Sequence, residues 1–175
     1  MKFVRQIFTV AIIIAAFSSN GFAQIYVEVD PLAYIMKGYS LHTGYVFNGM
    51  KIDAGVFGLE VPQAVHGNKD FTVKMGGFGA KWHYLGSSTA GWFAGFGAGY
   101  TKTTYSVTGG STSKNRFSFG VEGGYRFEFE NTGLYIMPWL GIDHAFGDSK
   151  TTVNGKIFEE GAVSFFPTVH IGWAF

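Results

Sequence analysis

The chain contains no cysteine, so neither a disulfide framework nor a thiolate metal site can stabilise it. Only 4 of its 175 residues are proline, whereas 26 are glycine and 18% are aromatic, a balance that favours strands over helices. Beyond the first residues no apolar run approaches the ~20 residues of a spanning helix, which excludes a helical membrane protein. An excess of positive charge is also lacking, because 13 basic side chains face 12 acidic ones, and this excludes the basic footprint of a nucleic-acid-binding protein.

The first segment has the layout of an export signal. Lys2 and Arg5 precede an apolar run over residues 7–17, and the small-residue site Gly21-Phe22-Ala23 follows it. This order is typical of a cleaved secretory signal. The alternative, an N-terminal membrane anchor, needs a longer apolar run. We therefore expect residues 1–23 to be a signal peptide and residues 24–175 to form one mature domain.

The rest of the chain alternates with a period of two, which indicates strands with two chemically different faces. In the last segment the apolar face holds Phe165, Pro167, Val169, Ile171, Trp173 and Phe175. The opposite face, at the even positions 164–174, is mostly small or polar. Similar patterns predict eight strands, at residues 25–34, 39–47, 50–59, 71–84, 91–105, 115–128, 133–146 and 164–175.

The connections between these strands are sorted by length. The second, fourth and sixth links are short: Asn48-Gly49, residues 85–90 and residues 128–132. The third, fifth and seventh are longer and polar: residues 60–70, 106–115 and 147–163. Only the first link, residues 35–38, is an exception. Short turns on one rim and long loops on the other are typical of outer-membrane barrels.

The two faces differ in a way that predicts a closed antiparallel transmembrane up-and-down barrel. In hydrocarbon every backbone N–H and C=O group needs an internal partner, so a sheet must close. The outward aromatic residues near the short-turn rim are Tyr45, Phe47, Trp82, Tyr84, Trp92, Tyr125, Phe127, Trp173 and Phe175. The inward polar residues are Glu28, Asp30, His42, Asp53, Lys81, His83, Arg116, Glu122, Arg126, Asp143 and His170. Eight strands enclose only their own side chains, so we expect a polar plug and no open pore. A soluble lipocalin-type barrel would need these faces reversed.

The mature chain resembles small bacterial outer-membrane barrels of the OmpA and OmpX type. The resemblance rests on the export signal, the eight alternating segments, the loop asymmetry and the closing residues 170–175, which end in Phe175. It implies location in the bacterial outer membrane and contact with membrane lipids and lipopolysaccharide. It also implies recognition of the last strand by the family's insertion machinery. The chain lacks the soluble cell-wall-binding domain of full-length OmpA, so tethering to peptidoglycan is not expected.

The sequence predicts no catalytic, cofactor-binding or metal site. The five histidines are His42, His66, His83, His144 and His170. The nearest approach to a triad is Asp143-His144 with Asp148 and Ser149, but neighbours along a strand point to opposite faces. His66 with Asp70 is too sparse for a metal. The glycine-rich pieces at residues 76–79 and 95–99 do not open helices and so are not nucleotide loops. We therefore predict a non-enzymatic structural or surface-interaction protein; the alternative is a lipid-modifying enzyme of the lipid A hydrolase or transferase type.

The long loops are the predicted contacts with an extracellular partner. Asn154-Gly155 lies between two short β-prone segments, which predicts a hairpin over residues 150–159. We expect this hairpin to protrude as a ribbon whose edges could pair with a partner strand. The candidate partner surface is therefore formed by residues 60–70 and 147–163.

Overall fold

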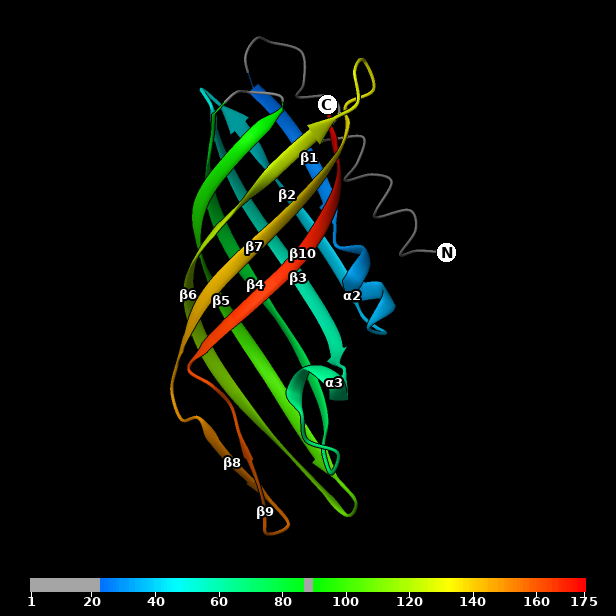
Figure 1. The fold of residues 1–175 in the computed structure, drawn as a ribbon, viewed down its shortest axis with the longest axis vertical. Helices are drawn as coiled ribbons and strands as arrows, with labels where there is room; N and C mark the ends of the chain where they lie inside the picture. The colour runs from blue at the N-terminus through cyan, green and yellow to red at the C-terminus, as the bar shows by residue number, and fades with distance from the viewer. Residues whose placement is uncertain (1–22, 87–89) are drawn as a thin grey trace, which may run out of the picture.

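In the computed structural model, which describes residues 23–86 and 90–175, the chain forms a closed antiparallel barrel (Figure 1). The strands of its wall are β1 (Ala23–Val29), β2 (Tyr39–Phe47), β3 (Met50–Val61), β4 (Thr72–Leu85), β5 (Gly91–Val107), β6 (Gly110–Glu128), β7 (Leu134–Phe146) and β10 (Val163–Ala174). Each wall strand pairs with the next wall strand in the sequence, and β1 closes the ring against β10. The predicted fold, an eight-stranded up-and-down barrel, is confirmed.

The strand registers show that the strands are steeply tilted relative to the barrel axis. Tyr45 of β2 faces Ile52, and the same row continues through Trp82, Phe96, Val121, Ile142 and Phe165. Continuing this row from Phe165 with the offsets of the β10–β1 and β1–β2 pairings brings it back to β2, at extrapolated position 35. This position is ten residues from the starting residue Tyr45, so the register shift around the closed barrel is ten residues. A shift of this size over eight strands corresponds to a strand tilt of about 43°. Eight strands at this tilt enclose a narrow interior.

The two rims of the barrel differ. One rim, here called the turn end, carries the β2–β3, β4–β5 and β6–β7 turns and the barrel's chain ends (Figure 1). At this rim Asn48 and Gly49 have φ values of 47° and 74°, as the predicted Asn-Gly hairpin turn requires. The opposite rim, the loop end, carries α2 (Pro31–Ile35), α3 (Gln63–His66), β8 (Lys150–Val153) and β9 (Lys156–Glu159). Among the described residues, no helix is long and apolar enough to cross a membrane.

The first predicted strand, residues 25–34, is too long. β1 ends at Val29, and Asp30 caps α2 by accepting a hydrogen bond from the Leu32 backbone N–H at 2.8 Å. Pro31 then occupies the first helical turn, where its missing N–H is not needed. The first connection is consequently longer than predicted and includes a helix, so it is no longer an exception to the loop asymmetry.

The predicted long loop over residues 106–115 is also wrong. β5 and β6 continue past the rest of the barrel as a paired ribbon, with Ser106 opposite Ser111 and Val107 opposite Gly110. Only Thr108 and Gly109 form the turn, where Gly109 has φ of 86°. This stretch is polar because the ribbon extends beyond the other strands at the loop end, where its outer side faces water. The predicted signal peptide lies outside the described residues, apart from Ala23.

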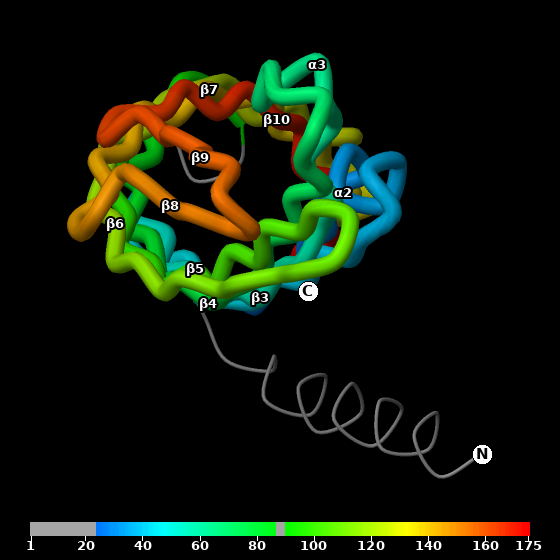
Figure 2. The backbone as a smooth tube through the Cα atoms, turned by 90° about the horizontal axis from the view of Figure 1, so that it is seen from below, coloured from blue at the N-terminus to red at the C-terminus, as the bar shows by residue number. Residues whose placement is uncertain are grey.

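The predicted hairpin in the last loop is present as β8 and β9, joined at Asn154-Gly155. It does not protrude freely. Seen along the barrel, the hairpin lies across the mouth at the loop end (Figure 2). Its inner face buries Val153 and Phe158 in an apolar cluster with Phe71, Val73 and Tyr105 of the neighbouring segments. Burial of this apolar face is what holds the hairpin down.

Candidate functional site

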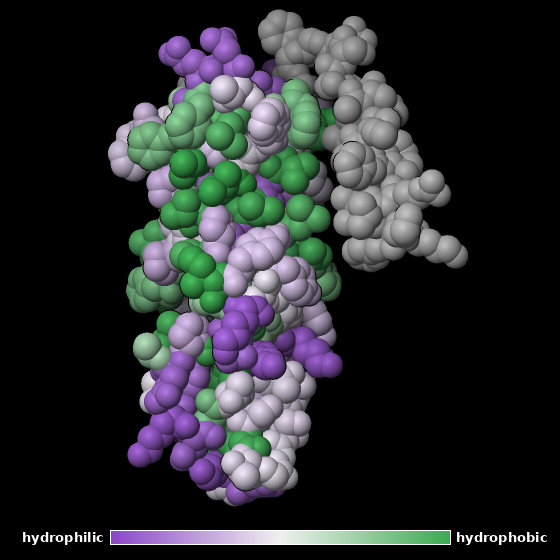
Figure 3. Space-filling view, turned by 90° about the vertical axis from the view of Figure 1, so that its right-hand side faces the viewer, coloured by the Kyte–Doolittle hydropathy of each residue, from purple (hydrophilic) through white to green (hydrophobic). Residues whose placement is uncertain are grey.

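The outer surface of the barrel carries an apolar belt. Many large apolar side chains on the strands are exposed, among them Leu41, Ile52, Val56, Phe96, Val121, Leu140, Ile142 and Ile171. Figure 3 shows hydrophobic side chains over the half of the molecule toward the turn end, with hydrophilic side chains at the turn-end rim and over the half toward the loop end. An exposed apolar area of this extent is far larger than the scattered patches of a soluble protein, and it indicates a non-aqueous surrounding.

Exposed aromatic rings border this belt on both sides. At the turn end they include Tyr45, Trp82, Tyr84, Trp92, Phe127, Trp173 and Phe175, as predicted, while Tyr125 and Phe47 are half-buried. The second border was not predicted: on the strands, its exposed rings are Tyr39, Phe78, Tyr100, Phe117, Phe146 and Phe165. Phe78, Tyr100, Phe117 and Phe146 are direct cross-strand neighbours. Their alignment across the four strands follows from the strand registers.

The separation of the two aromatic borders matches a membrane. On β6, Phe117 and Phe127 lie on the outer face ten residues apart. With a rise of about 3.3 Å per residue and a tilt near 43°, this spacing corresponds to roughly 25 Å along the barrel axis. Transmembrane barrels have an apolar band of about this height, flanked by aromatic girdles.

The interior holds a network of charges centred on Glu28. Its carboxylate accepts hydrogen bonds from the Lys51 ammonium and from the Tyr135 hydroxyl, the latter at 2.5 Å, and it contacts His170 Nδ1 at 2.8 Å. Asp53 extends the network, because its Oδ1 lies 2.9 Å from His42 Nδ1 and its Oδ2 lies 4.0 Å from Lys51 Nζ.

Three members of this network, Tyr26, Lys51 and Tyr135, are not in the inward set predicted from sequence. Tyr26 donates to Asp53 Oδ2 at 3.2 Å, and Tyr135 and Lys51 both contact Glu28. All three are among the largest fully buried side chains. Each of them occupies an inward-facing position in the alternation of its strand, so alternation could have identified them. The two tyrosines were harder to recognise, because an aromatic ring on a face predicted to be polar stands out less than a charged group.

A second cluster lies between β4, β6 and β7. Lys81 Nζ is 3.0 Å from Glu122 Oε2, and His83 Nε2 contacts the other oxygen of the same carboxylate. The Lys81 ammonium also lies 3.6 Å from the ring centroid of Trp139, whose ring reaches His170 of the first network. Every residue of the predicted inward set lies on the inner side of the wall, and most of these residues are buried.

Arg126 differs from the other inward charges. It is 2% exposed and lies over the Tyr135 ring at 3.9 Å, yet no guanidinium nitrogen forms a hydrogen bond with any described residue. Near the loop end, Arg116 is paired, with Nη1 2.8 Å from Glu160 Oε2 and Nη2 3.2 Å from the Ala145 carbonyl. Glu160 follows β9, so this ion pair ties the hairpin segment to the wall.

The structure does not assemble the weak triad considered from sequence. Asp143 faces inward, opposite Gly120, whereas His144 is exposed on the outer face beside Phe146. Asp148 and Ser149 are exposed in the loop that follows. His83 and His170 contact carboxylates of the interior network. Within residues 23–86 and 90–175, no group of three or more potential ligand side chains is placed to hold a metal ion.

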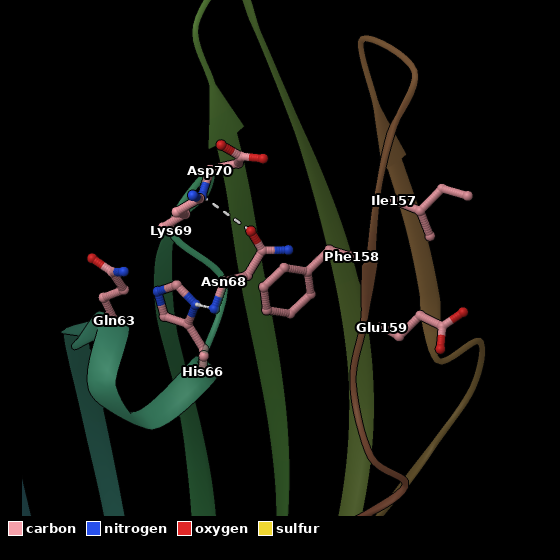
Figure 4. A pocket seen from close by; sticks show the side chains of 9 residues that line it. Gln63, His66, Asn68, Lys69, Asp70, Ile157, Phe158 and Glu159 are labelled. Carbon is pink, nitrogen blue, oxygen red and sulfur yellow. Dashed lines mark hydrogen bonds between the residues drawn. The ribbon is translucent and has the colours of Figure 1, made fainter.

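The two loops predicted to meet a partner come together at the loop end. They line a hollow of about 610 Å³ formed by residues 63 and 66–70 on one side and 157–159 on the other. Figure 4 shows the rings of His66 and Phe158 facing one another across it, and their centroids are 5.7 Å apart.

Hydrogen bonds between residues two apart in the sequence shape one wall of this hollow. The Asn68 backbone N–H donates to His66 Nδ1 at 3.2 Å, and the Asp70 N–H donates to Asn68 Oδ1 at 3.0 Å (Figure 4). An ion pair then joins the two walls, because Lys156 Nζ lies 3.2 Å from Asp70 Oδ2. Polar groups held by these hydrogen bonds and by the ion pair therefore border the hollow, and the rings of His66 and Phe158 line it.

Comparison with solved structures shows the fold. Neisserial surface protein A (NspA) superposes with a TM-score of 0.58 at 11% identity, covering 87% of this chain and 96% of that protein. A major outer membrane protein from Thermus thermophilus gives 0.53 at 11% identity, covering 89% and 100%. The N-terminal β-barrel domain of Pseudomonas aeruginosa OprF gives 0.51 at 12% identity, with the same coverage. The architecture is therefore that of small eight-stranded outer-membrane barrels, as the resemblance to OmpA and OmpX implied.

No protein-family model matches the sequence, and no curated protein matches it significantly.

Proposed function

We propose that the mature chain spans the bacterial outer membrane, with its loop end outside the cell, as a structural or surface-interaction protein and not as an enzyme. The observation that carries this proposal is the apolar belt between two aromatic girdles on a closed barrel. The belt needs a hydrocarbon surrounding, and closure satisfies the backbone inside it. The short turns belong on the periplasmic side and the long loops on the external side. The structural neighbours support the same location.

The barrel interior serves as a polar plug and not as a conducting pore. Glu28, Lys51, Asp53 and His170 are each at least 97% buried and contact one another in pairs. A continuous water channel would compete for these contacts, whereas opposite charges held together inside a narrow barrel fill its cross-section. The apolar cluster beneath β8 and β9 supports closure at the outer mouth.

The interaction site is the hollow at the loop end. Its lining includes the apolar side chains of Phe158 and of Ile157, which is 58% exposed. The charged residues Lys69, Asp70 and Glu159 also line it. An apolar centre with a polar border is the usual layout of a protein contact. Replacing residues 150–159 by a tight turn should abolish surface binding of a partner; unchanged binding would remove this assignment.

Export and insertion follow from the two ends of the precursor. Residues 1–23 direct secretion and are removed, and the last strand, with Trp173 and Phe175 on its outer face, is read by the insertion machinery. Trp173 and Phe175 are about half exposed on the folded barrel. Sequencing the mature N-terminus tests the cleavage, with Gln24 expected as its first residue.

Because the chain has no cysteine, single cysteines can test the membrane assignment cleanly. Cysteines at Ile171 and Phe96, both outward in the belt, should resist a membrane-impermeant thiol reagent in intact vesicles. A cysteine at exposed Thr152 should react at once. Rapid labelling at both belt positions would overturn the proposal. Mass spectrometry of lipid A from cells with and without the protein should give the same acyl pattern; an altered pattern would favour the lipid-modifying enzyme.

A further inference from the structure

Three lysines cluster on the outer surface just beyond the loop-end girdle. Lys37 follows α2, Lys74 lies on β4 and Lys102 lies on β5, and all three are exposed. Lys74 faces Thr104 across the β4–β5 ladder and Gly76 faces Lys102. The two lysines are therefore diagonal neighbours, with Cα atoms within about 7–8 Å.

Glu60 joins Lys37 to this pair. Its Oε1 lies 3.1 Å from Lys37 Nζ and its Oε2 lies 3.8 Å from Lys74 Nζ. The Glu60 backbone N–H also donates to the Met36 carbonyl at 2.9 Å, which holds the end of α2 beside β3. Lys102 forms no ion pair within the described part of the chain. Two of the three lysines thus share one carboxylate and the third contacts none among the described residues, so the cluster keeps an excess positive charge.

The depth of the cluster matches that of lipid headgroups. Lys74 is four residues from Phe78, and Lys102 is two residues from Tyr100, on the same outward face. Phe78 and Tyr100 stack at 5.7 Å and belong to the loop-end girdle. The strand rise and tilt put the lysine backbones about 5 to 10 Å beyond these rings along the barrel axis. Aromatic girdles lie at headgroup level, so the ammonium groups reach the phosphates.

Exposed lysine is confined to the loop end. Within the described residues, the exposed lysines are Lys37, Lys69, Lys74, Lys102, Lys150 and Lys156, all on loop-end segments. The lysines that are not exposed include Lys51 and Lys81, which point into the barrel. The turn end exposes the carboxylate of Glu130 instead. The charge distribution therefore distinguishes one membrane leaflet from the other.

From this arrangement we infer that Lys37, Lys74 and Lys102 form a docking surface for the phosphate groups of an anionic lipid in the leaflet at the loop end. The girdle rings contact the lipid's acyl region, and the ammonium groups contact its phosphates. The density of positive charge fits a lipid with more than one phosphate, such as a bis-phosphorylated lipid A. This inference rests on the proposed membrane location and adds the residues that bind the lipid and the phosphate groups that they contact.

The test uses the full mature chain, refolded into vesicles of phosphatidylethanolamine containing a minor fraction of bis-phosphorylated lipid A. Native mass spectrometry after gentle detergent release counts the lipid A molecules retained per barrel. The variant Lys74→Ala/Lys102→Ala should retain lipid A roughly tenfold or more weakly, because each lysine near a charged membrane surface strengthens binding about fivefold. The matched control Lys150→Ala/Lys156→Ala removes the same charge from the β8–β9 hairpin and should retain lipid A normally.

Further comparisons decide between sources of phosphate. Dephosphorylated lipid A should not be retained, and phosphatidylglycerol should be retained less than bis-phosphorylated lipid A. Competition by millimolar inorganic phosphate as effective as that by lipid A would indicate a free-phosphate site and overturn the inference. Equal retention by both double variants would also overturn it. Heat-modifiable gel mobility confirms folding of each variant; a wild-type barrel that never enters vesicles would refute the membrane proposal itself, a result distinct from insertion without lipid preference.

Discussion

The interior network makes a sharp prediction for the variant Lys51→Met. Lys51 is 1% exposed, and its ammonium contacts the Glu28 carboxylate, the Asp53 carboxylate at 4.0 Å and the Tyr26 ring at 4.2 Å. Methionine has a similar volume but no charge. The substitution therefore leaves Glu28 and Asp53 as two buried carboxylates without their shared cation.

The expected loss is large because the remaining partners cannot replace a full charge. Glu28 keeps the Tyr135 hydroxyl and His170, and Asp53 keeps Tyr26 and His42. Removing one member of a buried ion pair typically costs about 3–5 kcal/mol of unfolding free energy. Removing both charges costs much less, so Lys51→Met/Glu28→Gln should recover most of the loss.

The measurement is urea unfolding of the refolded barrel in lipid vesicles, followed by tryptophan fluorescence and by heat-modifiable gel mobility. The double variant, measured together with both single variants Lys51→Met and Glu28→Gln, gives the coupling energy of Lys51 and Glu28. The control Lys150→Met removes an exposed ammonium paired with Glu159 and should leave the midpoint almost unchanged. If Lys51→Met were no less stable than this control, or the double variant no better than the single one, the interior would not be a stabilising ion-pair network.

Three further substitutions test the belt, the tight interior and the cap. Leu140→Arg puts a charge into the belt and should lower stability in vesicles by about 2–4 kcal/mol, measured by urea unfolding. Gly44→Ala would drive its Cβ into the Tyr26 hydroxyl, and the resulting overpacking should cost roughly 1–3 kcal/mol in the same assay. Phe158→Ala removes the ring that packs on Phe71 and Tyr105, so the β8–β9 hairpin should be cleaved faster by an added protease.

Each of these has a matched control. Asn115→Arg adds the same charge outside the belt and should be tolerated. Gly99→Ala adds a Cβ that meets only contacts of 3.4 Å or more, so a loss equal to that of Gly44→Ala would contradict the packing argument. Ile157→Ala truncates the exposed neighbour of Phe158, and equal protection in both variants would show that the aromatic cluster does not hold the hairpin.

Alternation was sufficient to predict the faces of the barrel. Glu122 and Arg126 lie inside while Ile171 and Trp173 lie outside, because successive side chains of a strand point to opposite sides whatever the surrounding fold. Turn chemistry was equally local, since Asn48-Gly49 and Asn154-Gly155 adopt the positive φ values that these residues favour. Strand ends were harder to predict. Pro31 fits both a strand face and a first helical turn, and only the packing of α2 against β2, β3 and β10 decides between them.

The sequence by itself therefore determined the number of barrel strands, the outward and inward sets and the sorting of most connections, because all of these follow from neighbours along the chain. Closure was predicted from the need to satisfy the backbone in hydrocarbon, whereas the β1–β10 pairing that closes the ring joins distant strands. Relations between strands required the tertiary structure. The tilt, the alignment of Phe78 with Tyr100 and Phe117, the pairing of Glu28 with Lys51 and the meeting of His66 with Phe158 depend on registers and loop docking. A register is fixed by the sum of many cross-strand contacts around a closed ring, and no single segment carries that information.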